Sequence, residues 1–136
     1  MSGRRRLVDA NLIVRYLVQD HEMHGKAAGK LFEACDRGEV EIVVLSAVLA
    51  ECVFVLESFY EHPRANIAAA LSTLISSPGV AISENAVHLE ALERYRKTKL
   101  RFVDCLLAAA AKAGNTPVAT FDEGLRKFGD VPIENP

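Results

Sequence analysis

The chain has 136 residues, of which half are hydrophobic and a quarter are charged, and its formal net charge is −2. This length is typical of one globular domain, and the sequence predicts a single domain over residues 1–136. The small net charge neither favours nor excludes a nucleic-acid partner. Every apolar run is shorter than the roughly 18 to 20 residues that a membrane span needs, so no membrane partner is expected.

The three cysteines, Cys35, Cys52 and Cys105, are scattered through apolar helical segments. They form no Cys-x-x-Cys pair and no zinc-ligand spacing, so they are expected to be reduced and buried. The apolar run that follows Arg4–Arg6 is interrupted by polar residues, which makes it a poor secretory signal. These features predict a cytoplasmic protein.

The first half of the chain alternates short apolar runs with longer helical patterns. Residues 6–9 are expected to form a strand and residues 10–19 a helix. A second helix is expected over residues 22–36. Residues 41–46 form a continuous apolar run that is too short for a helix, which predicts a buried parallel strand. A strongly apolar helix is then expected over residues 47–60.

The second half continues the alternation, with a helix expected between Pro63 and Pro78. The remaining expected elements are a strand at 80–83, a helix at 84–97, an alanine-rich helix at 103–115, a strand at 116–121, and a short helix after Asp122, to which residues 131–133 can add a last strand.

Strands that alternate with helices predict an α/β fold, in which helices cover both faces of a central, mainly parallel sheet of about four to five strands. This is a three-layer α/β/α arrangement. In such sheets, ligands bind in the crevice outside the carboxyl ends of the strands. The residues at these ends are therefore the first candidates for a functional site.

Polar residues occur where three of the expected strands end, and two more acids interrupt apolar helices. Asp9, Ser46 and Asp122 end their strands and are expected at one rim of the sheet. Glu51 is the only charged residue between Val43 and Leu56. Asp104 is similarly isolated at the head of an alanine-rich helix.

Four carboxylates at one rim, in apolar surroundings, would be costly to bury and would repel one another. A divalent cation resolves both problems, and clustered carboxylates suit Mg²⁺ or Mn²⁺ better than zinc. Each acid also has a structural interpretation. Asp9, Asp104 and Asp122 can cap helices or turns, and Glu51 can form a buried pair with an arginine. Because separate strand ends converge in this fold class, the shared metal site is the preferred interpretation.

Four segments in order resemble the PIN domain family, and specifically the VapC-type toxins of toxin–antitoxin pairs. They are LVDANLIVRYL (7–17), LSAVLAECVFVLESFY (45–60), FVDCLLAAAAKAGN (102–115) and VATFDEGLRKF (118–128). The resemblance covers almost the whole chain and implies a PIN-like version of the predicted fold.

The resemblance implies that Asp9, Glu51, Asp104 and Asp122 are catalytic, metal-binding acids. Their supporting polar groups would be Asn11, Ser46 and Thr120. Two positions depart from the family pattern: Arg101 stands where the third motif usually has an additional acid, and Ala10 stands where threonine is frequent.

Family resemblance further implies an endoribonuclease that uses one or two Mg²⁺ or Mn²⁺ ions to hydrolyse RNA phosphodiester bonds. It would be the toxin of its pair, silenced by an antitoxin protein, and would form a homodimer. A metal ion would polarise the phosphodiester and lower the pKa of a bound water. This explains why the chemistry needs no nucleophilic serine or cysteine.

A basic run before Asp104 is the candidate RNA contact, because an acidic site must still attract a polyanion. A solvated helix end, whose cations complement the helix dipole, is the alternative for this run. The candidate residues are Arg94, Arg96, Lys97, Lys99 and Arg101.

Two other functions compete with the nuclease. One is a catalytically inert PIN-like module that binds RNA or protein, which Arg101 favours and the intact acid quartet opposes. The other is a phosphotransfer domain with Asp9 as the phosphorylated nucleophile. Phosphatases of that kind need a second aspartate two residues later, and Asn11 stands there instead.

Overall fold

The computed structural model describes residues 4–136, and its chain divides into two compact units, Met1–Asn85 and Ala86–Pro136. Each unit contains helices and a small parallel sheet. The sequence predicts a single domain over residues 1–136. Residues 1–3 of this range lie outside the part of the chain that the structure describes. The single domain stays a prediction.

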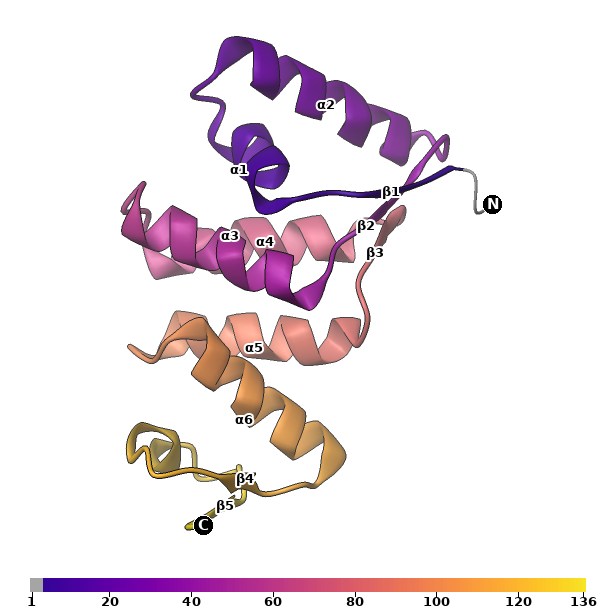
Figure 1. The fold of residues 1–136 in the computed structure, drawn as a ribbon. Helices are drawn as coiled ribbons and strands as arrows, with labels where there is room; N and C mark the ends of the chain where they lie inside the picture. Colours follow the sequence, from indigo (N-terminus) through magenta and orange to yellow (C-terminus); the bar gives the residue numbers. More distant parts are fainter. Residues whose placement is uncertain (1–3) are drawn as a thin grey trace. The chain divides into compact units, whose positions relative to one another are not determined.

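The first unit is built around a three-stranded parallel sheet with the strand order β1-β2-β3 (Figure 1). Its strands are β1 (Arg5–Leu7), β2 (Glu41–Val43) and β3 (Val80–Ala81). In the register, Leu7 lies opposite Val43, which in turn lies opposite Ala81. The four helices of this unit are α1 (Ala10–Val18), α2 (Glu22–Asp36), α3 (Ser46–Ser58) and α4 (Arg64–Ser76).

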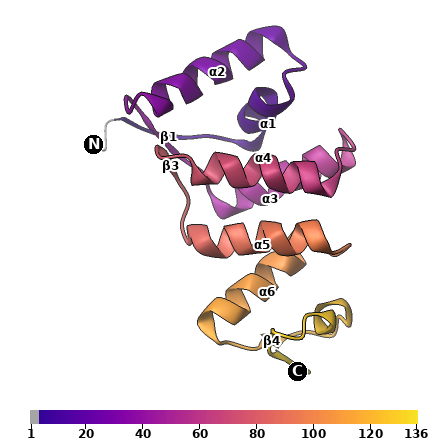
Figure 2. The ribbon, with the colours of Figure 1, turned by 180° about the vertical axis from the view of Figure 1, so that it is seen from behind.

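Helices α1 and α2 pack against each other, and α3 and α4 form a second packed pair (Figures 1 and 2). Both α1 and α2 begin at side-chain caps: Asp9 accepts from the Leu12 N–H, and His21 accepts from the His24 N–H. Such caps satisfy N–H groups that have no partner within the helix. The largest fully buried side chains of this unit are Ile13, Ile42, Leu49, Leu56, Ile67, Leu71 and Ile75.

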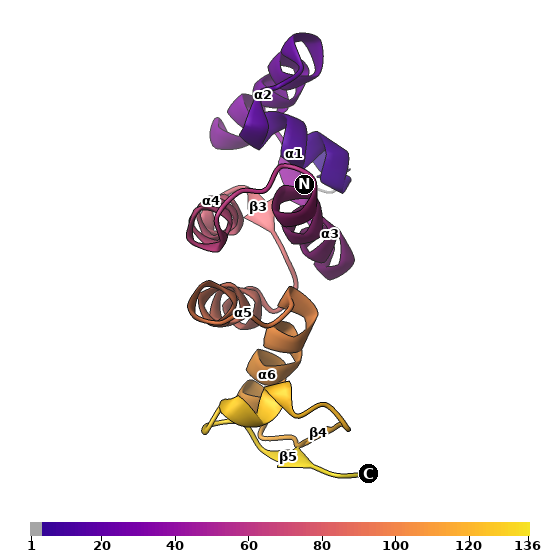
Figure 3. The same ribbon diagram turned by 90° about the vertical axis from the view of Figure 1, so that its left-hand side faces the viewer.

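The second unit carries α5 (Asn85–Lys97), which starts at the last residue of the first unit, and α6 (Phe102–Gly114) (Figure 3). Strands β4 (Val118–Ala119) and β5 (Ile133–Glu134) pair in parallel. A 3₁₀-helix, η2 (Gly124–Lys127), lies between them in the sequence. A hydrophobic cluster joins α6 to this C-terminal segment. Its members are Ala108, Ala111, Val118, Leu125 and Val131, with Phe128 and Ile133 packed against them.

The α/β class and the parallel pairing predicted from the sequence are confirmed. The strands are shorter than expected, and the five strands of the described chain are divided between the two sheets. The predicted strand 41–46 ends at Val43, and Ser46 is the first residue of α3. Ser46 therefore does not end a strand. An apolar run alone could not locate this boundary, because Val44 and Leu45 suit either element.

A buried arginine anchors the C-terminal segment of the second unit. Arg94 is 7% exposed and forms a forked pair with Asp130, at 3.1 and 2.6 Å. Its guanidinium carbon also lies 4.8 Å from the centroid of the Phe128 ring. Lys112 Nζ approaches the same Asp130 carboxylate at 2.9 Å. The pKa of Asp130 is lowered well below its usual range, chiefly by the hydrogen bonds from Arg94 and Lys112.

Asp130→Asn is expected to destabilise the protein by about 1–2 kcal/mol, because it removes the nearer of the two acids that pair with the buried Arg94 and leaves only Glu90, 3.7 Å from Nε. The estimate is below that for a fully buried pair, since the Asp130 side chain is 44% exposed. The carboxyl pKa is depressed in the folded state, so this stabilisation is complete above the ordinary pKa of 3.8 and is lost as the pH falls below it. Urea unfolding of both proteins between neutral and strongly acidic pH measures the effect.

The matched control is Lys112→Gln, which removes the exposed member of the same network. Its effect should stay below about 1 kcal/mol, because solvated ion pairs contribute little. Equal stability of wild type and Asp130→Asn at neutral pH would contradict the anchoring role.

Gly79 and Gly29 offer opposite outcomes for the same substitution. A Cβ at Gly79 would lie 2.5 Å from the Cys35 Sγ and 2.9 Å from the Cys35 carbonyl oxygen, so Gly79→Ala must displace backbone and should lower the melting temperature. A Cβ at Gly29, inside α2, meets no atom within 4 Å. Gly29→Ala should therefore stabilise by up to about 1 kcal/mol through helix propensity. Calorimetry that finds the reverse order would overturn this packing.

Candidate functional site

Asp9 lies in the turn between β1 and α1, where the sequence places it. Its Oδ1 accepts from the Leu12 N–H at 2.9 Å, so Asp9 is the N-cap of α1. This cap uses one carboxylate oxygen and leaves Oδ2 for another ligand. Asp9 and Asn11 are both exposed and line one cavity of about 260 Å³ between α1 and α2.

Glu51 lies in α3 on an exposed face that also carries Ala47, Phe54 and Ser58. Apolar surroundings were expected for this carboxylate, and that expectation was wrong. The opposite side of α3 is buried. Because the exposed side also carries apolar residues, the composition of the helix does not distinguish it from the buried side.

Cys52 follows Glu51 in the sequence and contacts the residue after Asp9. Its thiol is fully buried and lies 3.9 Å from the Ala10 carbonyl oxygen, across the contact between α1 and α3. Burial raises the pKa of this thiol to about 12, and the negative charges of Glu51 and Asp9 add to the increase. Both acids of the first unit are therefore close enough to this thiol to act on its pKa.

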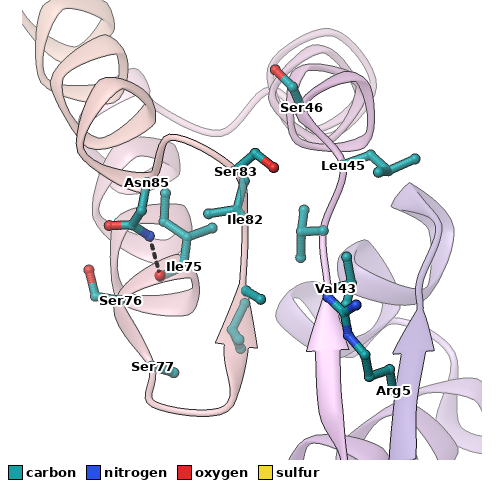
Figure 4. Close-up of a pocket in the computed structure, with 13 residues that line it drawn as sticks. Arg5, Val43, Leu45, Ser46, Ile75, Ser76, Ser77, Ile82, Ser83 and Asn85 are labelled. Carbon is teal, nitrogen blue, oxygen red and sulfur yellow. Dashed lines mark hydrogen bonds between the residues drawn. The ribbon is translucent and has the colours of Figure 1, made fainter. Parts of the chain in front are cut away.

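Ser46 lines a separate cavity of about 610 Å³ near the ends of β2 and β3 (Figure 4). Several polar groups there are already engaged: Arg5 pairs with Glu41 at 2.7 Å, and the Asn85 amide donates to the Ile75 carbonyl at 2.7 Å. Ser77 donates to the Thr73 carbonyl. Arg5, Asn85 and Ser77 are therefore each engaged in a local contact, and the cavity that Asp9 lines does not include Ser46.

Asp104 is the most enclosed of the four acids, with a side chain that is 14% exposed. It lies in the first turn of α6, where the helix dipole favours a negative charge. The N-cap is Arg101, so Asp104 is not the cap that the alternative interpretation required. Arg101 Nε lies 3.8 Å from Asp104 Oδ2.

Asp122 is held in a tight turn after β4. Its Oδ1 accepts from the Gly124 N–H, and Thr120 Oγ1 accepts from the Asp122 N–H, both at 2.9 Å. A Cβ on Gly124 would lie 2.9 Å from the Leu100 side chain. The Asp122 turn therefore packs close to the segment that leads into α6 and Asp104.

The predicted basic patch is not uniform. Arg94 is buried against Asp130, so it is a structural residue. It is therefore removed from the candidate RNA contacts. Arg96 and Lys97 both pair with Glu93 on the surface of α5. Lys99 and Arg101 are exposed in the turn between α5 and α6. Sequence spacing could not distinguish Arg94, because its partner lies far along the chain.

Two basic residue types, arginine and histidine, also line the Asp9 cavity and were not singled out as site residues. Arg15 and His24 line this cavity together with Asp9 and Asn11. Arg15 also pairs with Asp20 at 3.0 Å, and Asp20 accepts from the Tyr60 hydroxyl at 2.7 Å. Asn11 and Arg15 are four residues apart and therefore lie on one face of α1. This spacing could have identified Arg15 from the sequence.

The described residues, 4–136, contain no group of three or more His, Cys, Asp or Glu side chains arranged to hold a metal ion. The acids instead occur as a pair in each unit, Asp9 with Glu51 and Asp104 with Asp122. The donor chemistry fits Mg²⁺ or Mn²⁺, because all four are carboxylates and Asp9 and Asp122 each use only Oδ1 for a local hydrogen bond. Asp104 adds a carboxylate that is largely withdrawn from water.

Among the described residues, no helix is both long and apolar enough to cross a membrane.

No curated protein matches the sequence closely enough to count as a relative. The model of the PIN domain family matches residues 6–131. PIN domains are typically metal-dependent nucleases. The chain belongs to the PIN domain family.

Proposed function

We propose that this protein is a metal-dependent endoribonuclease and the toxin of a toxin–antitoxin pair of the VapC type. The observation that carries the proposal is Asp104, an acid that is 14% exposed at the start of α6. A carboxylate so withdrawn from water is costly unless a cation balances it. PIN domains are typically metal-dependent nucleases, so a divalent metal ion is the cation that we expect to balance the Asp104 charge.

Asp9, Glu51, Asp104 and Asp122 would hold one or two Mg²⁺ or Mn²⁺ ions. The metal would supply Lewis-acid activation of the phosphodiester and a water of lowered pKa. The chain's own contribution is orientation: the Leu12 N–H fixes the Asp9 carboxylate, and the Gly124 N–H fixes that of Asp122. Thr120 holds the Asp122 backbone, which supports its proposed positioning role.

Asn11 and Ser46 are the other proposed supporting groups. Asn11 shares its cavity with Asp9, which suits a role beside that carboxylate. Ser46 lines a different cavity, so its support of the acids is the weaker part of the proposal. RNA would be bound by Arg96, Lys97, Lys99 and Arg101, which are all exposed.

An antitoxin and a second copy of the chain are the proposed protein partners, in the cytoplasm. The first unit exposes large apolar side chains on and just after α3, including Phe54 at 68% and Phe59 at 69% exposure. Aromatic side chains on a surface are typical of protein interfaces. This surface supports the proposal of protein partners without distinguishing the antitoxin from the second copy.

An inert PIN-like module that binds RNA or protein is the alternative function. Its specific support is Arg101, whose guanidinium lies beside Asp104 where it opposes a metal ion. Purified protein that binds Mn²⁺ and RNA but never cleaves RNA would favour this alternative over the nuclease.

Asp9→Asn and Asp104→Asn are each expected to reduce RNA cleavage by about 100-fold or more, because each removes a charged ligand of the proposed metal site. Asparagine is as good an N-cap as aspartate, so Asp9→Asn should leave α1 intact. The assay is cleavage of total RNA with Mg²⁺ or Mn²⁺, and cleavage should stop with EDTA.

The matched control for this assay is Asp36→Asn, at an exposed residue of α2 outside the candidate site. It should cleave like the wild type. Full activity of both Asp9→Asn and Asp104→Asn would disprove the proposed role of the acids.

Replacement of Lys97 and Lys99 by alanine should weaken RNA binding and flatten its salt dependence. Each phosphate contact that is lost should reduce the slope of log K against log salt by about 0.7–1. Fluorescence anisotropy with a short single-stranded RNA, in EDTA to prevent cleavage, measures both quantities. The control removes two lysines of α2, Lys26 and Lys30. If both double variants behave alike, the effect comes from net charge and the patch is not an RNA contact.

A further inference from the structure

We propose that Arg101 is a built-in counter-cation for Asp104, and that it competes with a divalent metal ion for this carboxylate. The inference rests on the proposed function, in which Asp104 is a metal ligand. It assigns to Arg101 a tuning role in metal binding that is separate from contact with RNA.

The two side chains differ strongly in their access to water. The Asp104 side chain is 14% exposed, whereas that of Arg101 is 86% exposed. Withdrawing a carboxylate from water is unfavourable unless a positive charge or a hydrogen-bond donor replaces the lost solvation. Arg101 supplies such a charge from the preceding turn, because the two residues are three apart at the start of α6.

The separation shows that this interaction is electrostatic and loose. Arg101 Nε lies 3.8 Å from Asp104 Oδ2, which is beyond hydrogen-bond distance. Nearly all of the Arg101 side chain is in solvent, so the guanidinium can turn away without breaking a packed contact. It therefore balances Asp104 while no metal is bound, and a metal ion can displace it.

Displacement must cost binding free energy, because the guanidinium repels the arriving divalent ion. The nearby cations act differently. Arg96 and Lys97 are each paired with Glu93, and Lys99 is an exposed charge two residues before Arg101. Lys99 is therefore the matched control: it carries the same charge in the same turn, and in the described part of the chain it forms no ion pair with Asp104.

The test is a calorimetric titration of the full chain with Mn²⁺, in the absence of RNA. Arg101→Gln keeps a long polar side chain and removes the charge. We expect it to bind Mn²⁺ about three- to tenfold more tightly than the wild type. Lys99→Gln should change the dissociation constant by less than about twofold, because an exposed charge that is not paired with Asp104 is largely screened. Circular dichroism of each variant establishes that it is folded.

The same titration in an Asp104→Asn background separates a local effect from a general one. If Arg101 acts through Asp104, Arg101→Gln should no longer tighten Mn²⁺ binding there. Equal shifts for Arg101→Gln and Lys99→Gln, or no shift for either, would overturn the inference. A failure of both wild type and Arg101→Gln to bind Mn²⁺ would instead refute the proposed metal-dependent function itself, and the inference with it.

Discussion

The parallel direction of the strands is the constraint on which the placement of the candidate residues depends. A parallel strand must be followed by a connection that crosses back over the sheet, usually a helix. Each such strand therefore ends in a turn that leads to a helix, and polar residues collect in these turns. Asp9 follows β1 and caps α1, and Asp122 follows β4 and precedes η2. In both turns the carboxylate is fixed by a backbone N–H, so the local structure orients an acid whether or not a metal is present.

The distribution of buried charge distinguishes structural residues from candidate functional ones. Arg94 is buried and closely paired: Asp130 forms a fork with it and Phe128 lies against its guanidinium. The Asp104 side chain is 14% exposed, against 8% for that of Arg94, but its charged neighbour Arg101 lies 3.8 Å away and mostly in solvent. A paired and packed charge stabilises a fold, whereas an enclosed charge with a loose partner is typical of a binding site. This contrast supports Asp104 more directly than its position in a motif does.

Much of the fold could be predicted from local patterns. Helix α2 was predicted with its observed bounds, because its hydrophobic period and its end before Gly38 are both local signals. The end of β2 was missed, since an apolar run continues through Val44 and Leu45 into α3. The solvent face of Glu51 and the burial of Arg94 depend on tertiary packing. No spacing along the sequence reveals that the partner of Arg94 is Asp130, 36 residues away.

The exposure of three of the four acids changes the physical argument for a metal. The sequence suggested that the carboxylates would be tolerable only with a cation between them, yet Asp9, Glu51 and Asp122 are exposed and can be solvated by water. Their charges therefore do not require a metal for the chain to fold, in contrast to structural metal sites, where binding energy is folding energy. Of the four acids, only Asp104 is largely enclosed, and Arg101 lies where its charge can replace part of the lost solvation. A chain arranged in this way can fold first and bind a divalent ion afterwards, so that the metal serves the chemistry and not the stability of the fold.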